Sequence, residues 1–272
     1  MAITDLERVR IVLVQTAGPR NLGSVARVMK NMGIYDLWLV DPQCDPGDPE
    51  ARQMAVHAQD LLDQVRIVPR LTDALQDCQR AIATVGRTDL SAPSHPPELG
   101  LTWLLEVSRG AIVFGAEDRG LSNAELQHCQ RVLQIPTTHS HPSLNLAQAV
   151  AICAYTLRRL AIDGSDGVTG PPDSPTQKDY SRPNLPSKMA EDLLEFSTIA
   201  EREAAYTQLE DLLLRIGFLY PHTQFQRMQK VRCLFERSHL TSAEVTFLRG
   251  ILRQMSWALT AAPPTPTEQE RS

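Results

Sequence analysis

The stretch FGAEDRGLSNAELQHCQRVLQIPTTHSHPSLNLAQAV, from Phe114 to Val150, contains two polar loops, and each of them follows an apolar run. The first loop is residues 115–120 and the second is residues 136–142. A long apolar helix is expected to begin at Leu144, directly after the second loop. Ligands in open α/β folds bind at the carboxyl ends of strands. The two loops therefore predict a ligand site.

On both sides of this stretch, apolar runs typical of buried strands alternate with segments of helical periodicity. This alternation predicts the α/β class, with a mostly parallel sheet and helices on both of its faces. The expected strands are residues 9–14, 37–40, 66–68, 81–85, 111–114 and 132–135. The expected helices are residues 22–33, 51–62, 71–79, 99–107 and 144–160, with a further one starting at the capping-box pair Ser122 and Glu125.

The strand pattern ends after residue 162, so residues 1–162 are expected to form the α/β domain. Residues 163–186 are rich in glycine and proline, which predicts a flexible linker. Residues 187–260 have helical character only and predict a small C-terminal helical domain. Residues 261–272 are rich in proline, threonine and glutamate and are expected to be disordered.

Charge is unevenly distributed in the helical part. Residues 186–214 hold two basic and seven acidic side chains, whereas residues 215–253 hold seven basic and two acidic ones, a formal charge of +5. Phe225, Phe235 and Phe247 are interleaved with these cations. Two interpretations stand about even: a helical bundle with solvated charges and phenylalanines in its core, or a face that binds nucleic-acid phosphates.

Composition excludes several classes of protein. The chain has 272 residues, 42% of them hydrophobic and 22% charged, which is ordinary for a globular protein. No membrane span and no signal peptide are expected from the short apolar runs and the acidic start. The five cysteines form no C-x-x-C pair, and His139 and His141 lack further ligands, so no metal site is expected. Reduced thiols predict a cytoplasmic protein.

The chain contains no G-x-G and no P-loop motif, which disfavours a nicotinamide-dependent enzyme or a P-loop NTPase. What remains is a set of polar residues near the predicted strand–helix junctions: Asn21, Arg27, Glu117, Ser143 and Asn145. Each has an ordinary structural explanation. Asn21 and Ser143 could cap helices, Arg27 could be a surface charge, and Glu117 could pair with Arg119. Their joint placement predicts a functional site but does not name its reaction.

Three motifs built from these residues resemble the SPOUT methyltransferases, which are S-adenosylmethionine-dependent RNA methyltransferases with a trefoil-knotted carboxyl end. The motifs are P-x-N-x-G-x-x-A-R at 19–27, F-G-x-E-x-x-G-L-[ST] at 114–122, and I-P followed by S-L-N-L-A-x-A-V within 135–150. Within the TrmH/TrmJ family the likeness is closest to the TrmJ branch. Those enzymes are tRNA 2′-O-methyltransferases that act on cytidine or uridine at position 32 of the anticodon loop. Segments 227–235 and 248–254 also resemble the TrmJ carboxyl-terminal extension.

The resemblance implies a knot near residues 115–145 and a homodimer with active sites near the shared interface. It also implies that S-adenosylmethionine is held largely by the backbone of three loops, which accounts for the missing glycine fingerprint. The residues implied in cofactor binding are Thr84, Val85, Gly86, Gly115, Ile135, Pro142, Ser143 and Leu144. The chain departs from the family pattern at residues 138–141 (Thr-His-Ser-His), where relatives often carry an acidic and an aromatic residue.

The resemblance also implies catalytic roles. Arg27 is expected near the ribose. Because a guanidinium is not deprotonated in proteins, stabilising the developing alkoxide or gripping a phosphate is better founded than a role as base. Ser143 and Asn145 are expected to orient Arg27 and the substrate, and Glu117 to brace the loops or hold Asn21.

The helical domain is expected to supply phosphate contacts through Arg227, Lys230 and Arg232, and no metal is expected for the transfer step. Two alternatives remain open, a ribosomal RNA 2′-O-methyltransferase and a non-catalytic RNA-binding relative.

Overall fold

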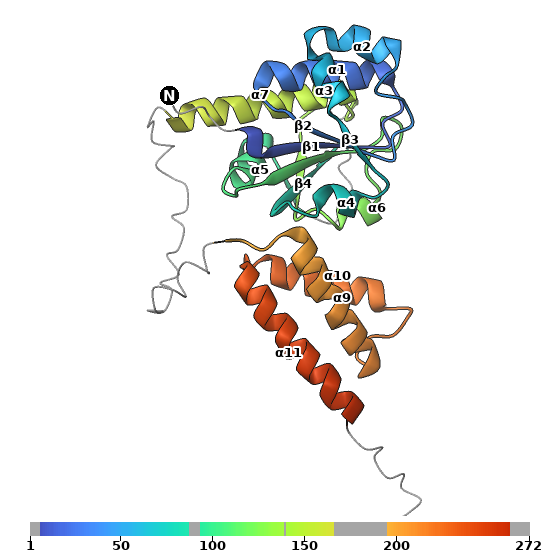
Figure 1. The fold of residues 1–272 in the computed structure, drawn as a ribbon, viewed down its shortest axis with the longest axis vertical. Coiled ribbons are helices and arrows are strands. Elements are labelled where there is room, and N and C mark those ends of the chain that lie inside the picture. Colours follow the sequence, from blue (N-terminus) through green and yellow to red (C-terminus); the bar gives the residue numbers. More distant parts are fainter. Residues whose placement is uncertain (1–5, 87–92, 139, 166–194, 262–272) are drawn as a thin grey trace, which may run out of the picture. The chain divides into compact units, whose positions relative to one another are not determined.

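The computed structural model describes residues 6–86, 93–138, 140–165 and 195–261. The chain divides into two compact units, Met1–Arg182 and Pro183–Ser272 (Figure 1). The first unit combines a sheet with helices, whereas the described part of the second contains three helices. The predicted linker, 163–186, and the predicted tail, 261–272, lie outside the described residues except at 163–165 and 261, which are helical rather than irregular.

The first unit is built on a seven-stranded sheet of order β3-β2-β1-β6-β4-β7-β5, and its neighbouring strands are parallel. The strands are β1 (Val9–Val14), β2 (Asp36–Val40), β3 (Arg66–Val68), β4 (Arg80–Val85), β5 (Ser94–His95), β6 (Gly110–Phe114) and β7 (Arg131–Gln134). The parallel sheet predicted from the sequence is confirmed. Only β5 was missed, because its proline-rich segment pairs at the sheet edge, where proline is tolerated.

Helices cover both faces of this sheet. They are α1 (Pro19–Met32), α2 (Pro49–Ala55), α3 (Gln59–Asp63), α4 (Leu71–Leu75), α5 (Pro97–Leu104), α6 (Asn123–Leu126) and α7 (Leu146–Ser165), with short 3₁₀ turns at Leu6–Arg8 and Val56–Ala58. In Figure 1, α1, α2, α3 and α7 lie on one face, and α4 and α6 lie on the other. Helix α7 packs against both α1 and α5.

Several helix bounds differ from those expected. Helix α1 begins three residues early because Pro19 suits the first helical position, so Asn21 lies inside the first turn. The helix expected over 51–62 is divided where Val56 adopts a φ of 54°. Helix α4 ends at Leu75 rather than Gln79. Gly33 ends α1 in the left-handed conformation.

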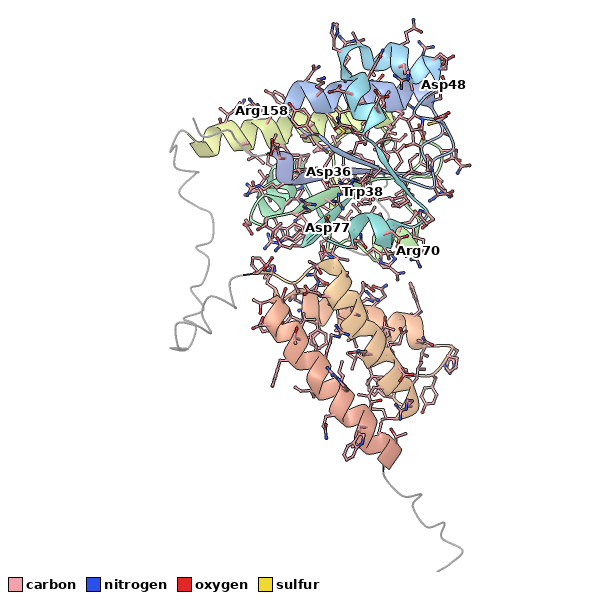
Figure 2. The ribbon with its side chains drawn as sticks, in the orientation of Figure 1. Asp36, Trp38, Asp48, Arg70, Asp77 and Arg158 are labelled. Carbon is pink, nitrogen blue, oxygen red and sulfur yellow. The ribbon has the colours of Figure 1, made fainter. Side chains whose placement is uncertain are left out.

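The two faces of β1 differ in chemistry. Ile11 and Leu13 join the hydrophobic core shared with α1 and α7. Arg10, on the opposite face, is fully buried and pairs with Asp36 (2.8 Å) and Asp77 (2.6 Å), two residues labelled in Figure 2. Although burial opposes it, the Arg10 guanidinium holds the pKa of Asp77 below its usual value. This cluster at the start of β1 stabilises the fold, away from the carboxyl ends of the strands.

The second unit consists of α9 (Ile199–Arg215), α10 (Gln224–Glu236) and α11 (Ser242–Ala261). Thr241 and Glu244 form a capping box at the start of α11, because each residue's side chain accepts the other's backbone N–H. Tyr206, Leu219 and Met228 form a small core. In the part of the chain that the structure describes, no helix is long and apolar enough to cross a membrane. The same residues contain no group of three or more potential metal ligands.

Candidate active site

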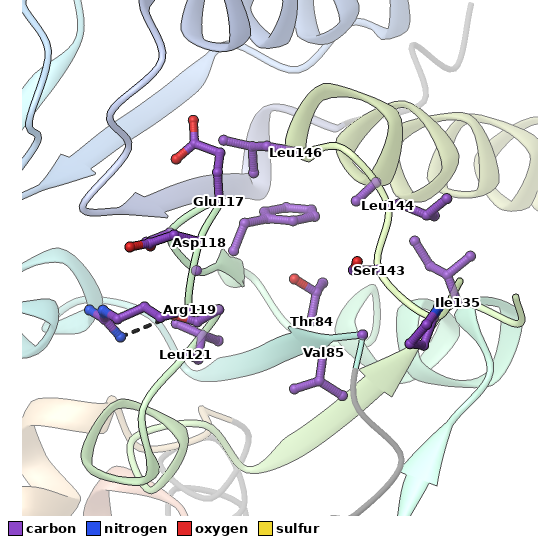
Figure 3. A pocket seen from close by; sticks show the side chains of 17 residues that line it. Thr84, Val85, Glu117, Asp118, Arg119, Leu121, Ile135, Ser143, Leu144 and Leu146 are labelled. Atoms are coloured by element: carbon purple, nitrogen blue, oxygen red, sulfur yellow. Dashed lines mark hydrogen bonds between the residues drawn. The ribbon is translucent and has the colours of Figure 1, made fainter. Parts of the chain in front are cut away.

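A cavity of about 320 Å³ opens at the carboxyl ends of β4, β6 and β7 (Figure 3). In Figure 3, Thr84 and Val85 lie on the opposite side of the cavity from Glu117 and Leu146. The lining includes every residue that the sequence predicts to contact a cofactor: Thr84, Val85, Gly86, Gly115, Ile135, Pro142, Ser143 and Leu144. The structure therefore brings together three loops that are far apart in the sequence.

Glycines allow these loops to approach one another. A Cβ atom on Gly115 would lie 2.2 Å from the carbonyl carbon of Gly120 and 2.4 Å from the nitrogen of Leu121. A Cβ atom on Gly86 would lie 3.2 Å from both the carbonyl oxygen of Pro142 and the Cα of Ser143. A side chain at Gly115 thus has no room, and the loop after β4 touches the loop after β7.

Glu117 joins the loop after β6, residues 115–120, to the start of α1. Its carboxylate accepts hydrogen bonds from the backbone N–H groups of Ala17 and Gly18, both at 3.2 Å, and from Asn21 Nδ2 at 3.0 Å. Asn21 Oδ1 in turn accepts a hydrogen bond from Asn145 Nδ2 at 2.9 Å. The three side chains form a continuous polar bridge, here called the Glu117–Asn21–Asn145 bridge. Of the two roles expected for Glu117, holding Asn21 is thus seen directly.

Glu117 does not form the ion pair with Arg119 that was one ordinary explanation for it. Arg119 instead pairs with Glu125 at 2.9 Å and donates to Gln15 Oε1 at 2.6 Å. The hydrogen bonds to Glu125 raise the pKa of Arg119. Burial alone would raise the pKa of Glu125, but hydrogen bonds from Arg119 and from the Ser122 N–H hold it below its usual value. Arg119 is therefore paired with Glu125 of α6 and with Gln15, which follows β1.

Neither of the expected helix caps is used. Asn21 lies within α1, whose N-cap residue is Gly18. At α7 the capping side chain is Asn145, whose Oδ1 accepts the backbone N–H of Ala147 at 2.9 Å, so Ser143 is not the cap. Ser143 lines the cavity, and its hydroxyl has no hydrogen bond to another described residue. Asn145 therefore serves both as helix cap and as one end of the polar bridge.

The four cationic residues predicted to contact RNA differ in their exposure and in their partners. Arg27 is exposed on α1, outside the cavity lining, with no hydrogen bond or ion pair to another described residue, including Ser143 and Asn145. Arg232 forms a bidentate ion pair with Glu203. Arg227 donates to the carbonyl oxygen of Phe218. Lys230 alone of the three helical cations is exposed and without such a partner among the described residues.

Sequence reasoning did not single out the apolar lining of the cavity. Phe114, Leu121, Leu146 and Ala149 line it together with the loops. Apolar periodicity marks such residues as core, and nothing in a linear pattern separates a core position from a cavity wall.

Burial raises the pKa of the Cys44 thiol to about 11, and Glu117 adds to this effect, so the thiol remains protonated at neutral pH.

Glu117→Gln is expected to lower the Tm of the first unit by about 3 °C, which corresponds to a loss of roughly 1 kcal/mol. An amide offers one oxygen where the carboxylate offers two, and its NH₂ group would oppose a backbone N–H. Scanning calorimetry measures the Tm, and amide hydrogen exchange at Ala17 and Gly18 should become faster. Glu98→Gln, which changes an exposed carboxylate on α5, is the control and should retain the wild-type Tm. Unchanged exchange at both amides in Glu117→Gln would contradict the proposed hydrogen bonds.

Comparisons of the sequence with known proteins identify its family. Residues 8–155 match the family described as SpoU rRNA Methylase family, and residues 200–265 match the C-terminal domain of the tRNA methyltransferase TrmJ. The chain is 38% identical over 251 residues to the tRNA (cytidine/uridine-2′-O-)-methyltransferase TrmJ of Cronobacter sakazakii, covering 91% of this chain and 95% of that protein. It is also 38% identical over 258 residues to the tRNA (cytidine/uridine/adenosine-2′-O-)-methyltransferase TrmJ of Pseudomonas aeruginosa, covering 92% and 94%.

Solved structures show the same likeness. The crystal structure of TrmJ from Z. mobilis ZM4 superposes with a TM-score of 0.72 at 27% identity, covering 91% of this chain and 98% of that chain. A methylase family protein from Haemophilus influenzae Rd KW20 superposes with a TM-score of 0.57 at 27% identity, covering 94% and 99%. Both the α/β unit and the helical unit are matched. This chain therefore belongs to the SpoU methylase family and, within it, to the TrmJ proteins.

Proposed function

We propose that this chain catalyses S-adenosylmethionine-dependent 2′-O-methylation of a tRNA ribose, at cytidine or uridine 32 of the anticodon loop. The observation that carries the proposal is the cavity, which gathers the eight predicted cofactor residues beside the Glu117–Asn21–Asn145 bridge. The two TrmJ relatives named above support the tRNA substrate, because the likeness extends over both units of the chain.

The cavity residues fit S-adenosylmethionine. Apolar side chains such as Phe114 and Ile135 suit an adenine ring, and loop backbone supplies hydrogen-bonding groups. Glu117 and Asp118 line the same cavity, and their negative charge suits a sulfonium cation. When bound, the cofactor supplies a methyl group on a positively charged sulfur. The free hydroxyl of Ser143 is available to hydrogen-bond the cofactor or the ribose.

Arg27 is the proposed catalytic cation. Its guanidinium is exposed and uncommitted within the described chain, so it is free to meet an RNA oxygen. Negative charge develops on the 2′-oxygen as its proton passes to solvent, and a guanidinium beside that oxygen stabilises the charge until the oxygen bonds the methyl group and the bond from that methyl to sulfur breaks. The Glu117–Asn21–Asn145 bridge ties the first turn of the Arg27 helix to the start of α7, and thereby positions α1 relative to the cavity.

We further propose the trefoil knot and the homodimer that the family likeness implies. The close approach of Gly86 to Ser143 supports a tight crossing of the chain at the cavity. In this proposal a second copy of the chain completes the active site, because Arg27 lies outside the cavity lining of its own chain. We also propose that transfer requires no metal, that the helical unit contacts RNA phosphates through cations such as Lys230, and that the enzyme acts in the cytoplasm.

Methyl transfer from labelled S-adenosylmethionine to unmodified tRNA transcripts tests the proposal. The expected product is a single 2′-O-methyl nucleotide at position 32, mapped by nuclease digestion, and its yield should be unchanged in excess EDTA. Transcripts with cytidine, uridine or adenosine at position 32 determine which bases are accepted. Ribosomal RNA is the comparison substrate.

Each alternative function predicts a different product. Transfer to another tRNA ribose would retain the reaction but overturn the position. Transfer to ribosomal RNA alone would reassign the substrate. Cofactor binding without transfer to either RNA would favour a binding-only relative.

A further inference from the structure

The segment joining α9 to α10 exposes a cluster of aromatic side chains, in the orange part of the chain that follows α9 in Figure 1. Phe218 and Tyr220 are 53% and 51% exposed, respectively. His222 stacks on Tyr220 with ring centroids 5.9 Å apart and an interplanar angle of 24°. These three rings, with Arg227, are here called the aromatic platform. Exposed apolar clusters of this kind on a folded unit mark interaction sites.

The backbone of this segment is well ordered by internal contacts. Gly217 adopts a φ of 76°, and the N–H groups of Phe218 and Leu219 both bond the carbonyl oxygen of Leu213, at 2.9 and 3.0 Å. Leu219 is 2% exposed and packs in the small core, so its neighbours Phe218 and Tyr220 are left at the surface. A platform held in place before binding loses less conformational entropy when a ligand arrives.

A cation is built into the platform. The Arg227 guanidinium lies 5.4 Å from the centroid of the Phe218 ring and 5.9 Å from that of Tyr220. It also donates to the Phe218 carbonyl oxygen, which secures its position. Aromatic faces and a planar guanidinium therefore occur side by side. Both groups stack on nucleobases.

The charge around the platform is positive. Residues 212–235 contain four basic side chains and no acidic one. Arg215 pairs with Asp211 at 3.8 Å and Arg232 with Glu203, so the positive charge at the platform comes from Arg227 and Lys230. Lys230 is exposed and has no ion pair to another described residue. Glu210 on α9 also contacts this segment, and its carboxylate accepts a hydrogen bond from Gln224 Nε2 at 2.8 Å. A polyanionic ligand suits this surface better than an acidic or purely aliphatic protein surface does.

We propose that the aromatic platform binds unpaired nucleotides of the RNA substrate by base stacking, with Lys230 at the flanking phosphate. This inference rests on the proposed function, since it names how the helical unit contacts the same RNA. Duplex RNA is recognised through phosphates and ribose hydroxyls, and its paired bases do not offer free faces. Exposed rings beside cations match single-stranded RNA, because every unpaired base has a face to stack.

The test measures tRNA affinity of the full-length protein at several salt concentrations. Tyr220→Ala and Phe218→Ala are each expected to raise the Kd for tRNA about tenfold, without changing kcat at saturating tRNA. The slope of log Kd against log salt should stay at its wild-type value, because neither ring carries charge. Lys230→Ala, by contrast, should reduce the magnitude of that slope by about 0.7–0.9.

Three controls separate stacking from other effects. Tyr220→Phe retains a ring face and should bind tRNA within about twofold of wild type. Phe247→Ala removes a ring that is 72% exposed on α11, outside the platform, and should leave the Kd unchanged. Tyr220→Ala should also weaken binding of a short unstructured oligoribonucleotide while leaving a duplex of the same length unaffected.

Wild-type tRNA affinity in both platform variants would overturn the inference, as would an equal loss in Phe247→Ala. A weaker affinity that follows a change in oligomeric mass, measured by sedimentation, would assign the rings to a protein–protein contact instead. Failure of the proposed function gives a different result. Wild-type protein would then transfer no methyl group to tRNA, whatever the platform variants do to RNA affinity.

Discussion

Arg27→Ala is expected to lower kcat for methyl transfer by about 10²–10³-fold while leaving the Kd for S-adenosylmethionine unchanged. The guanidinium lies outside the cavity lining, so its loss does not alter the residues that would contact the cofactor. Its contribution arises as negative charge develops on the ribose oxygen, and it therefore appears in kcat. Single-turnover kinetics measure the transfer step, and isothermal titration calorimetry measures cofactor binding.

Two variants make this result specific. Arg20→Ala removes an exposed arginine two turns earlier on the same helix, so it changes the charge of α1 by the same amount. It is expected to weaken tRNA binding at most severalfold and to keep kcat. Arg27→Lys retains the charge but loses the planar fork and should fall between alanine and wild type. Normal kcat in Arg27→Ala would remove its catalytic role.

Gly115→Ala is expected to destabilise the first unit by at least about 3 kcal/mol, which lowers its Tm by roughly 6–12 °C, and to abolish cofactor binding. The added Cβ would lie 2.2–2.5 Å from backbone atoms of Gly120 and Leu121. Backbone atoms have no alternative rotamer, so the loop itself must move. Because this loop carries Glu117, its displacement also breaks the polar bridge to α1.

Gly120→Ala is the matched control, because the two glycines lie in the same loop. At Gly120 an added Cβ meets nothing within 4 Å, and the cost arises only from its φ of 68°. That strain amounts to about 1–2 kcal/mol. Thermal unfolding and cofactor titration of both variants should therefore rank Gly115→Ala well below Gly120→Ala. Equal losses would show that backbone conformation, rather than steric contact, limits this loop.

Much of the first unit could be predicted because its signals are local. Apolar runs with β-branched residues mark β1, β4 and β6, and the glycines and prolines at their ends mark the loops. Five of the eight predicted cofactor residues lie within the family motifs at 114–122 and 135–150, whereas Thr84, Val85 and Gly86 were implied by the family resemblance alone. Boundaries were less accurate, as at Pro19 and Val56, because a helix end depends on the backbone conformation of single residues.

In the helical unit, composition indicated the basic segment but not which cations are free. Arg232 contacts Glu203 and lies 4.7 Å from the centroid of the Tyr206 ring, so it stabilises the bundle. Of the three phenylalanines expected in the core, only Phe235 packs there, whereas Phe225 and Phe247 are exposed. Helical periodicity was too weak on α10 to separate its inner face from its outer one.

The sequence by itself determined the order of strands and helices, the chemistry of the loops after β4, β6 and β7, and the division of charge in the helical part. Only the tertiary structure decided which polar groups meet. Glu117 bonds Asn21 across 96 residues of sequence, and Asn145 bonds Asn21 across 124. A linear pattern specifies which donors and acceptors exist. Their pairing depends on which atoms come within about 3 Å once the sheet has formed.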